Sequence, residues 1–264
     1  MKKISALLIV SALVLSLFSV SCATKKAAVA TETNVGETKW VTAVFVKEDA
    51  QAYTEADGDN EKLDTIWIYY SDCTFEQFVE LDDDIELFSK GSYTLTQGGD
   101  FVLKDDEPVV NITIRRSHKF QSGLLEEYLS EHTYDLGTLG FDQLYAYDND
   151  SRRVEAVFYG IEKQPFVESD GEREMLDTVW IYFNDMTFEQ YAWLDDEMVL
   201  FSTGTYAFSD GGDFIYEAEE KSFGDITLSR REKYQAGKGL SPYESTHTYD
   251  LNSLGFVVLV VPGK

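Results

Sequence analysis

Basic residues are scarce in this sequence. Its 264 residues contain 22 Lys and Arg against 48 Asp and Glu, a formal net charge of −26 at pH 7. If Lys2 and Lys3 are removed with a leader peptide, 20 basic residues remain against 48 acidic ones, and the net charge becomes 20 − 48 = −28. Such a surface repels phosphate backbones and anionic headgroups within a Debye length of about 8 Å. The composition therefore excludes nucleic-acid binding and favours solubility and cation binding.

Histidine and cysteine are rare too, with three and two residues. The motifs Gly-x-Ser-x-Gly, His-Glu-x-x-His and Cys-x-x-Cys are absent from the sequence, as is a phosphate-binding glycine loop. His132 and His247 each begin a His-Thr-Tyr-Asp stretch. Residues i and i+3 of a strand face opposite sides, so the aspartate cannot orient the histidine. The sequence predicts a protein that is not an enzyme and uses no cofactor; a carboxylate-dependent hydrolase is the alternative.

A long hydrophobic run occurs at one place, residues 4–20, behind Lys2 and Lys3 and ahead of Ser21 and Cys22. This layout resembles the signal peptide of bacterial lipoproteins, although Ser19 stands where that family most often has leucine. The resemblance implies a signal peptide at 1–21, cleavage before Cys22 and a diacylglyceryl thioether on its sulfur. It implies a cell-envelope protein outside the cytoplasm, lipid-anchored to the inner or outer membrane.

An ordinary signal peptide and an uncleaved membrane anchor are the alternatives, since the apolar run is near the lower limit of about 17 residues for a span. Two or more acyl chains hold a protein on a bilayer stably, at about 0.8 kcal/mol per buried methylene. Residues 22–39 show no periodicity and are predicted to be a lipidated flexible tether.

The remaining chain contains one unit twice. Residues 63–78 and 176–191 match at 11 of 16 positions, at an offset of 113. We place unit 1 at residues 40–148 and unit 2 at residues 153–264. The linker at 149–152 is too short for free tumbling, so we expect the units to be held in a restricted orientation.

The offset between the copies grows along the unit, to 114 at Ile112 and to 115 at His132. Single-residue insertions therefore fall near 104–111 and 122–126, which we predict to be loops. Cys73 is replaced by Met186 in the second copy, which predicts a small apolar filler rather than a nucleophile.

Strand patterns dominate both units, because Val, Ile, Tyr, Phe, Trp and Thr alternate with polar residues and are bounded by Gly, Asp and Asn. In unit 1 we place strands at 40–47, 63–71, 74–81, 85–96, 100–104, 110–120, 131–136 and 141–147, and one period later in unit 2. Residues 124–130 are compatible with a helical turn, but Pro242 in the second copy favours a loop. The fold class predicted is all-β, with two tandem small antiparallel β-barrel or β-sandwich units of about eight strands each.

Thr74-Phe75 after a tight turn, followed by Gly91-x-Tyr93, gives each unit a loose resemblance to lipocalin-like domains of bacterial lipoproteins. The second copy repeats the latter motif as Gly204-x-Tyr206. The resemblance implies a ligand-binding β-barrel. The Gly-x-Trp that lipocalins carry on their first strand is absent from this sequence.

The repeated hairpin predicts two faces. If it turns about Asp72 and Cys73, cross-strand partners have residue numbers that sum to 145. One face is then mostly apolar and forms the core, with Ile66, Ile68, Tyr70, Phe75, Gln77 and Val79. The other face mixes rings and carboxylates, with Thr65, Trp67, Tyr69, Glu76, Phe78 and Glu80.

The mixed face suits stacking on a sugar or a flat ligand while accepting hydrogen bonds from hydroxyl groups. Its predicted ligand-binding residues in the two units are Trp67, Tyr69, Glu76, Trp180, Tyr182 and Glu189. The alternative is a structural role for the tryptophans, which usually pack when they lie on a half-buried sheet.

Two further patterns carry charge. Arg116 and Arg230 share the parity of their apolar neighbours, which predicts that they point inward and either bind a ligand carboxylate or pair with a protein carboxylate. The acidic stretches at 55–59 and 168–172 place carboxylates at alternate positions around a glycine. They are a start toward a Ca²⁺ site, but lack the frame of an EF-hand and favour a solvated turn.

The sequence thus favours a membrane-anchored extracytoplasmic binding or interaction protein. Its predicted partners are the membrane, through the N-terminal lipid, and a glycan, small molecule or protein ligand. A structural cell-envelope repeat protein is the main alternative.

Overall fold

A computed structural model gives the fold of the protein. It describes residues 39–54, 58–96, 99–102, 110–121, 123–148, 152–209, 214 and 224–261. The predicted signal peptide, the predicted lipidation site Cys22, almost the whole tether and most of the linker lie outside the described residues, as do the first three residues of the acidic stretch at 55–59.

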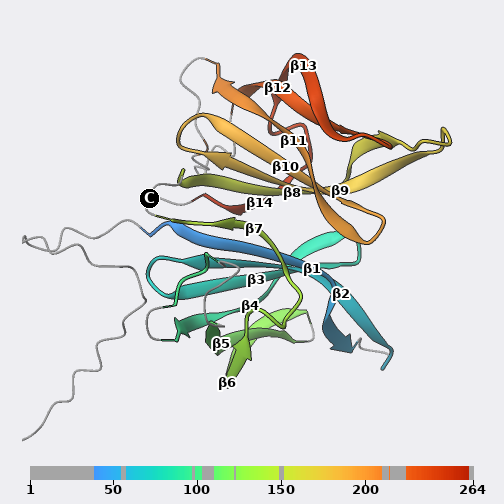
Figure 1. The fold of residues 1–264 in the computed structure, drawn as a ribbon. Coiled ribbons are helices and arrows are strands. Elements are labelled where there is room, and N and C mark those ends of the chain that lie inside the picture. Colours follow the sequence, from blue (N-terminus) through green and yellow to red (C-terminus); the bar gives the residue numbers. More distant parts are fainter. Residues whose placement is uncertain are drawn as a thin grey trace, which may run out of the picture.

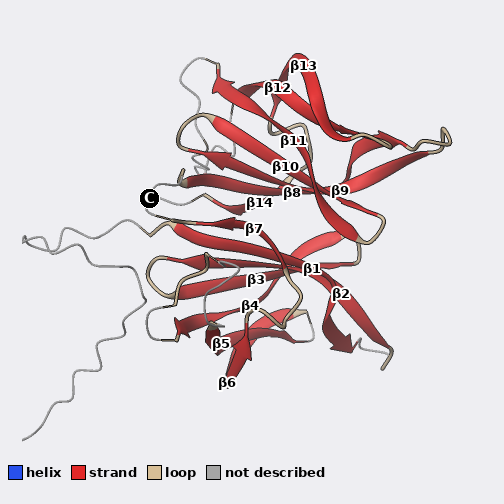
Figure 2. Cartoon of the chain, in the orientation of Figure 1, coloured by secondary structure: helices blue, strands red, loops and turns tan. Residues whose placement is uncertain are grey.

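The described residues form strands joined by turns and loops, and they contain no helix (Figure 2). The first sheet consists of β1 (Val41–Thr54), β2 (Asn60–Tyr70), β3 (Thr74–Leu81), β4 (Asp84–Leu95), β5 (Asn111–Gln121), β6 (Leu124–Asp135) and β7 (Asp142–Ala146). The second consists of β8 (Val154–Val167), β9 (Arg173–Phe183), β10 (Thr187–Leu194), β11 (Glu197–Phe208), β12 (Asp225–Gln235), β13 (Gly239–Asp250) and β14 (Val257–Val260). The prediction of two tandem all-β units is confirmed.

Each sheet is an antiparallel meander whose last strand returns to the first. The strand orders are β6-β5-β4-β3-β2-β1-β7 and β13-β12-β11-β10-β9-β8-β14. In the described part of the chain the two end strands of a sheet do not pair with each other, so each unit is an open seven-stranded sheet rather than a closed barrel. A further strand was predicted at 100–104, but residues 100–102 are not in a strand, and 103–104 lie outside the described residues.

Residues 124–130 belong to strand β6, so the loop or helical turn considered for them is wrong. Pro242 lies within β13, opposite Glu232 and next to a register shift. Since β13 is the edge strand of its sheet, the missing N–H of proline interrupts no pairing on the outer side.

The turns follow from local chemistry. Asp82 and Asp83 form the two-residue loop between β3 and β4 and have φ values of 53° and 60°. Positive φ at both central residues matches the twist of a tight hairpin, and aspartate tolerates it better than most residues do. Asp195 and Asp196 repeat the arrangement, with φ values of 52° and 63°.

The predicted register of the β2–β3 hairpin is wrong by one residue. Residues 71–73 form a three-residue loop, with Cys73 at a φ of 63°, and the paired residue numbers sum to 144, as in Tyr69 opposite Phe75. A one-residue slip moves every side chain of one strand to the other face. The faces are therefore Thr65, Trp67, Tyr69, Phe75, Gln77 and Val79 on one side and Ile66, Ile68, Tyr70, Glu76, Phe78 and Glu80 on the other.

Both faces of the hairpin are covered. The inner face, which carries Trp67, packs within its own unit against the connection between β6 and β7, which supplies Leu136 and Phe141. The outer face, which carries Ile66 and Ile68, packs against the other unit in a shared cluster with Val157, Val179 and Ile181 among its members. The two sheets thus lie face to face, with β7 and β14 beside the junction (Figure 1).

Polar contacts also join the units. The Tyr159 hydroxyl donates to the Glu80 carboxylate at 2.8 Å, and the Tyr191 hydroxyl oxygen lies 3.0 Å from the Leu144 carbonyl oxygen. The expected restricted orientation of the units is consistent with this shared core.

Candidate functional site

The predicted ring residues lie on the inner faces and are buried. Trp67 and Tyr69 are 7% and 5% exposed, and Trp180 and Tyr182 are 4% and 1% exposed. Trp67 packs on Phe75 at 5.2 Å between ring centroids, and Tyr69 meets Tyr93 edge-on at 5.1 Å. Burial raises the pKa of the Tyr69 and Tyr182 hydroxyls. These rings belong to the core and do not form an open stacking platform.

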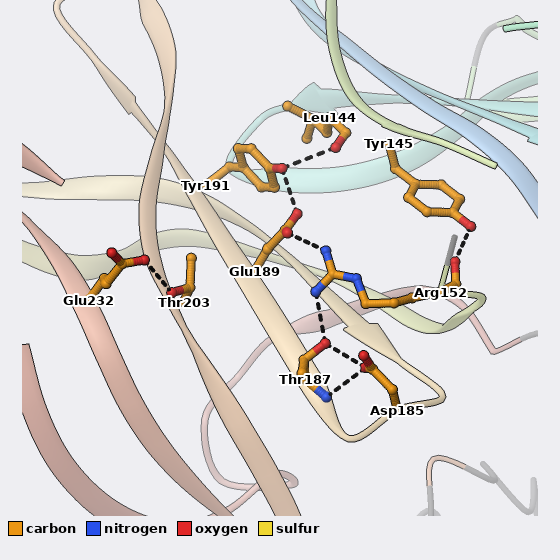
Figure 3. Close-up of polar contacts among 9 residues, drawn as sticks. All are labelled: Leu144, Tyr145, Arg152, Asp185, Thr187, Glu189, Tyr191, Thr203 and Glu232. Carbon is orange, nitrogen blue, oxygen red and sulfur yellow. Dashed lines mark hydrogen bonds and ion pairs between the residues drawn. The ribbon is translucent and has the colours of Figure 1, made fainter. Parts of the chain in front are cut away.

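Glu76 and Glu189, the two predicted carboxylates, lie on the outer faces of their hairpins, opposite the tryptophans. Glu76 accepts a hydrogen bond of 2.6 Å from the Tyr70 hydroxyl. Glu189 forms an ion pair with Arg152 and accepts a hydrogen bond of 2.8 Å from Tyr191 (Figure 3). The structure therefore separates Glu76 and Glu189 from the tryptophans with which the predicted register grouped them.

Figure 3 shows how Arg152 holds the start of the second unit. Its guanidinium donates to Thr187 Oγ1 at 2.8 Å. The guanidinium also lies 3.8 Å from the centroid of the Phe183 ring, which the figure does not draw. Lys39 takes the corresponding place in unit 1, with its ammonium 3.6 Å from the centroid of the Tyr70 ring. Glu189 thus has a structural role: its ion pair holds Arg152, which lies just before β8, the first strand of unit 2.

The predicted arginines point to the inner side, as their parity indicated. The Arg116 guanidinium lies 5.4 Å from the Trp67 ring centroid and donates to Ser89 Oγ at 3.3 Å. Arg230 lies 5.5 Å from the Trp180 centroid. Among the described residues neither arginine has a carboxylate partner, so the pairing that a purely structural arginine was expected to make is not seen there.

Lys119 and Lys233 lie beside these arginines and are not among the site residues predicted from the sequence. The Lys119 ammonium lies 5.2 Å from the Phe88 centroid and 5.6 Å from the Tyr128 centroid. Lys233 lies 5.5 Å from Phe201. Loss of hydration, and then the neighbouring arginine, lower the pKa of both ammonium groups.

A β-bulge explains why parity did not reveal the lysines. On a regular strand, residues 116 and 119 would face opposite sides. Opposite β4, Lys90 pairs with His118 and Gly91 with Arg116, which leaves Ser117 as an extra residue in β5. The extra residue shifts the alternation and lets both cations face the inner side. The repetition of Arg116 and Lys119 as Arg230 and Lys233 was the signal that could have found them.

A chain of buried polar groups supports the cations. Ser89 Oγ donates to the Gln77 amide oxygen at 2.7 Å, and the Gln77 amide donates to Gln51 and Thr65 at 2.8 and 3.0 Å. Gln77 and Ser89 are fully buried. Unit 2 repeats the chain through Ser202, Gln190 and Gln164. Because buried polar groups need partners, this network fixes the position of Ser89 and so orients the Arg116 guanidinium.

The other sequence candidates stay apart from this site. His132 lies on the exposed strand β6 beside the Tyr134 ring. In the acidic turn of unit 2, the Asp170 carboxylate accepts from the Glu172 N–H at 2.9 Å. Within the described ranges, no group of three His, Cys, Asp or Glu side chains is placed to hold a metal ion.

Cys73 and Met186 occupy a turn position with positive φ and differ in environment. Cys73 is 8% exposed and belongs to the inner core, whereas Met186 is 54% exposed. The apolar-filler interpretation therefore describes Cys73 and does not describe Met186.

Comparison of the sequence with protein families found no family model that matches, and comparison with curated proteins found no significant similarity. The part of the chain that the structure describes has no helix of the length and apolarity that a membrane span requires. The fold defines a two-unit all-β protein whose units share one core, with a repeated cation pair on the inner side of each sheet.

Proposed function

We propose that the protein is a lipid-anchored binding protein of the bacterial cell envelope, with one ligand site on the inner side of each unit. The observation that supports binding is the repeated placement of a half-buried arginine over a buried tryptophan, Arg116 over Trp67 and Arg230 over Trp180. The apolar leader ahead of Cys22 supports the anchor.

Arg116 and Arg230 are half-buried and have no carboxylate partner among the described residues. Removing a guanidinium from water has a free-energy cost that proteins usually offset with a carboxylate and further hydrogen bonds. This chain has 48 acidic residues, yet among the described ones none pairs with Arg116 or Arg230. A ring face and one hydroxyl, Ser89 for Arg116 and Tyr249 for Arg230, offset part of that cost. A ligand that accepts hydrogen bonds would offset the rest.

A structural envelope protein is the second candidate function, and the shared core between the units favours it. Ile66 and Ile68 of one unit and Val179 and Ile181 of the other are buried together. Mutual burial of these faces explains the duplication without a ligand. This alternative predicts that the inner cations bind nothing.

Binding is tested with the chain from Ala23 onward, which retains every described residue, on glycan and small-molecule arrays followed by calorimetry. We expect a ligand whose affinity falls about tenfold or more in Arg116→Gln/Arg230→Gln, because a charge-assisted hydrogen bond contributes about 1.5–3 kcal/mol. Arg115→Gln is the control, since Arg115 is exposed and pairs with Glu131 at 2.6 Å. Absence of any ligand, or equal loss in the control, would favour the structural alternative.

Anchoring is tested by Cys22→Ala in a bacterial host fed an alkyne-labelled fatty acid. The unchanged protein should incorporate the label and sediment with membranes. The variant should do neither, because the thioether needs the Cys22 sulfur. Labelling that persists in the variant would contradict the proposed lipidation.

A further inference from the structure

Each unit brings two cations together in a strongly acidic protein. Arg116 and Lys119 are both half-buried and meet at Ser89. Arg116 donates to the Ser89 hydroxyl at 3.3 Å, and Lys119 is the partner of Ser89 in the pairing of β4 with β5. In unit 2, Lys233 is the partner of Ser202 and Arg230 is the partner of Gly204 in the pairing of β11 with β12. Two like charges removed from water repel each other more strongly than at the surface. In a chain with a net charge of −26, an acidic neighbour would be the ordinary means of neutralising them.

Among the described residues, none of these four cations forms an ion pair with a carboxylate. Glu126 lies opposite Lys119 in the pairing of β5 with β6, but its side chain is exposed and the two do not form an ion pair. The groups closest to the Lys119 ammonium are the rings of Phe88 and Tyr128. Around Lys233 they are the rings of Phe201 and Tyr243. The nearest acidic residue in the sequence, Glu232, has its carboxylate hydrogen-bonded to Thr203 at 3.0 Å. The positive charge of each pair is thus bordered by rings.

The two copies keep the pair while its neighbours in the strand change. Between β5 and β12, Arg115 becomes Ser229, Ser117 becomes Arg231 and His118 becomes Glu232. The inward cations stay Arg and Lys in both copies. The surrounding rings are also retained, although the offset between the copies changes from 113 at Trp67 to 115 at Tyr128. Exposed charges on a strand would not need the same residue types and the same neighbouring rings in both copies.

The rings at the outer end of the pair are open to solvent. Tyr128 and Tyr243 are each 38% exposed, whereas Trp67 and Phe88 at the inner end are buried. Each lysine therefore lies beside a tyrosine ring that reaches solvent, and each arginine lies over a buried tryptophan. This arrangement suits a molecule with a negative group and a flat or apolar body.

We infer that each unit binds a small organic anion, a carboxylate on a flat or apolar body, through Arg116 and Lys119 in unit 1 and Arg230 and Lys233 in unit 2. The inference rests on the proposed binding function and names its ligand class. The arginine holds the carboxylate, the lysine supplies a second charge, and Tyr128 or Tyr243 contacts the body of the ligand. Two molecules are bound per chain.

The experiment uses 2-naphthoate and its neutral amide, 2-naphthamide, in calorimetry with the chain from Ala23 onward. We expect two naphthoate molecules per chain and at least about tenfold weaker binding of the amide. Lys119→Gln/Lys233→Gln should weaken naphthoate binding several-fold and leave amide affinity unchanged, while part of the preference for the acid remains because Arg116 and Arg230 are still present. Lys62→Gln/Lys238→Gln is the matched control, because it removes the same charge from two exposed positions.

The outcomes separate the inference from the proposed function. If the amide binds as well as the acid, or if the control loses as much affinity as the test variant, the anion inference is overturned while binding itself stands. If naphthoate does not bind although the arrays yield a neutral ligand, the inference also falls. If the lysine variants do not fold, the inference is tested by the salt dependence of ligand affinity in the unchanged protein. Naphthoate affinity should then decrease with added NaCl and amide affinity should not, and equal salt dependence overturns the inference.

Discussion

Gly91 and Gly204 show at the residue scale why the Gly-x-Tyr motif recurs. A Cβ on Gly91 would lie 2.0 Å from the Arg115 carbonyl oxygen, and one on Gly204 would lie 2.2 Å from the Ser229 carbonyl oxygen. The tyrosine two residues later closes the hairpin turn, because the Tyr93 hydroxyl donates to the Tyr70 carbonyl at 2.8 Å. The motif therefore has a structural explanation in close strand approach and a buried hydrogen bond.

Gly91→Ala should destabilise the protein by about 1–3 kcal/mol, because the backbone of β4 or β5 must move to admit the methyl group. Gly137→Ala is the control, since its Cβ would have no neighbour nearer than the Asp135 carboxylate at 3.4 Å. Urea denaturation with a constant m value measures the difference. Equal midpoints for the two variants would show that the close approach has no energetic consequence.

At the element scale, the β2–β3 hairpin shows what a strand pattern predicts and what it leaves open. The strands at 63–71 and 74–81 were predicted to within a few residues, because alternation and turn residues are local signals. The register was not, because residues 71–73 form a loop of three rather than two residues. Because the loop is one residue longer than predicted, Glu76 and Trp67 lie on opposite faces of the hairpin. The predicted face that combines rings with carboxylates therefore does not exist.

On strand β5, the alternation of side chains predicted the direction of Arg116 but not that of Lys119. Arg116 was placed on the inner side correctly, since Ile112 and Ile114 before it keep regular alternation. Lys119 was missed because the bulge at Ser117 lies between the two cations. Bulges depend on the partner strand, so parity within one strand cannot locate them.

At the scale of the whole molecule, the shared core couples the two units through an acidic contact. Glu80 lies at this junction and accepts the hydrogen bond from Tyr159. Burial, followed by the nearby carboxylates of Asp177 and Asp64, raises the pKa of the Glu80 carboxyl from 4.5 to about 7. Its counterpart in unit 2 is Trp193, so this feature is not repeated.

A raised pKa means that the folded state binds the proton more tightly than the unfolded state does. The contribution of Glu80 to stability is therefore fully present below pH 4.5 and is lost as the pH rises to about 7. Glu80→Gln should flatten the pH dependence of the free energy of unfolding in this window. It should raise stability at pH 8 by about 1 kcal/mol, a figure reduced for the partial exposure of the group.

Denaturant titrations at several pH values between 4.5 and 8 measure this dependence. Glu126→Gln is the control, because Glu126 is exposed on the edge strand β6. An unchanged pH profile in Glu80→Gln would show that Glu80 is not the titrating group at the junction.

The sequence by itself determined the duplication, the all-β class, most of the strands and the inward direction of Arg116 and Arg230. These are consequences of repetition and of a two-residue period, which are local. Only the tertiary structure decided the hairpin register, the burial of Trp67 and Trp180, and the meeting of Arg116 with Lys119. Those outcomes depend on one extra residue in a loop or strand and on a second unit that covers the outer face. No period within a single strand encodes them.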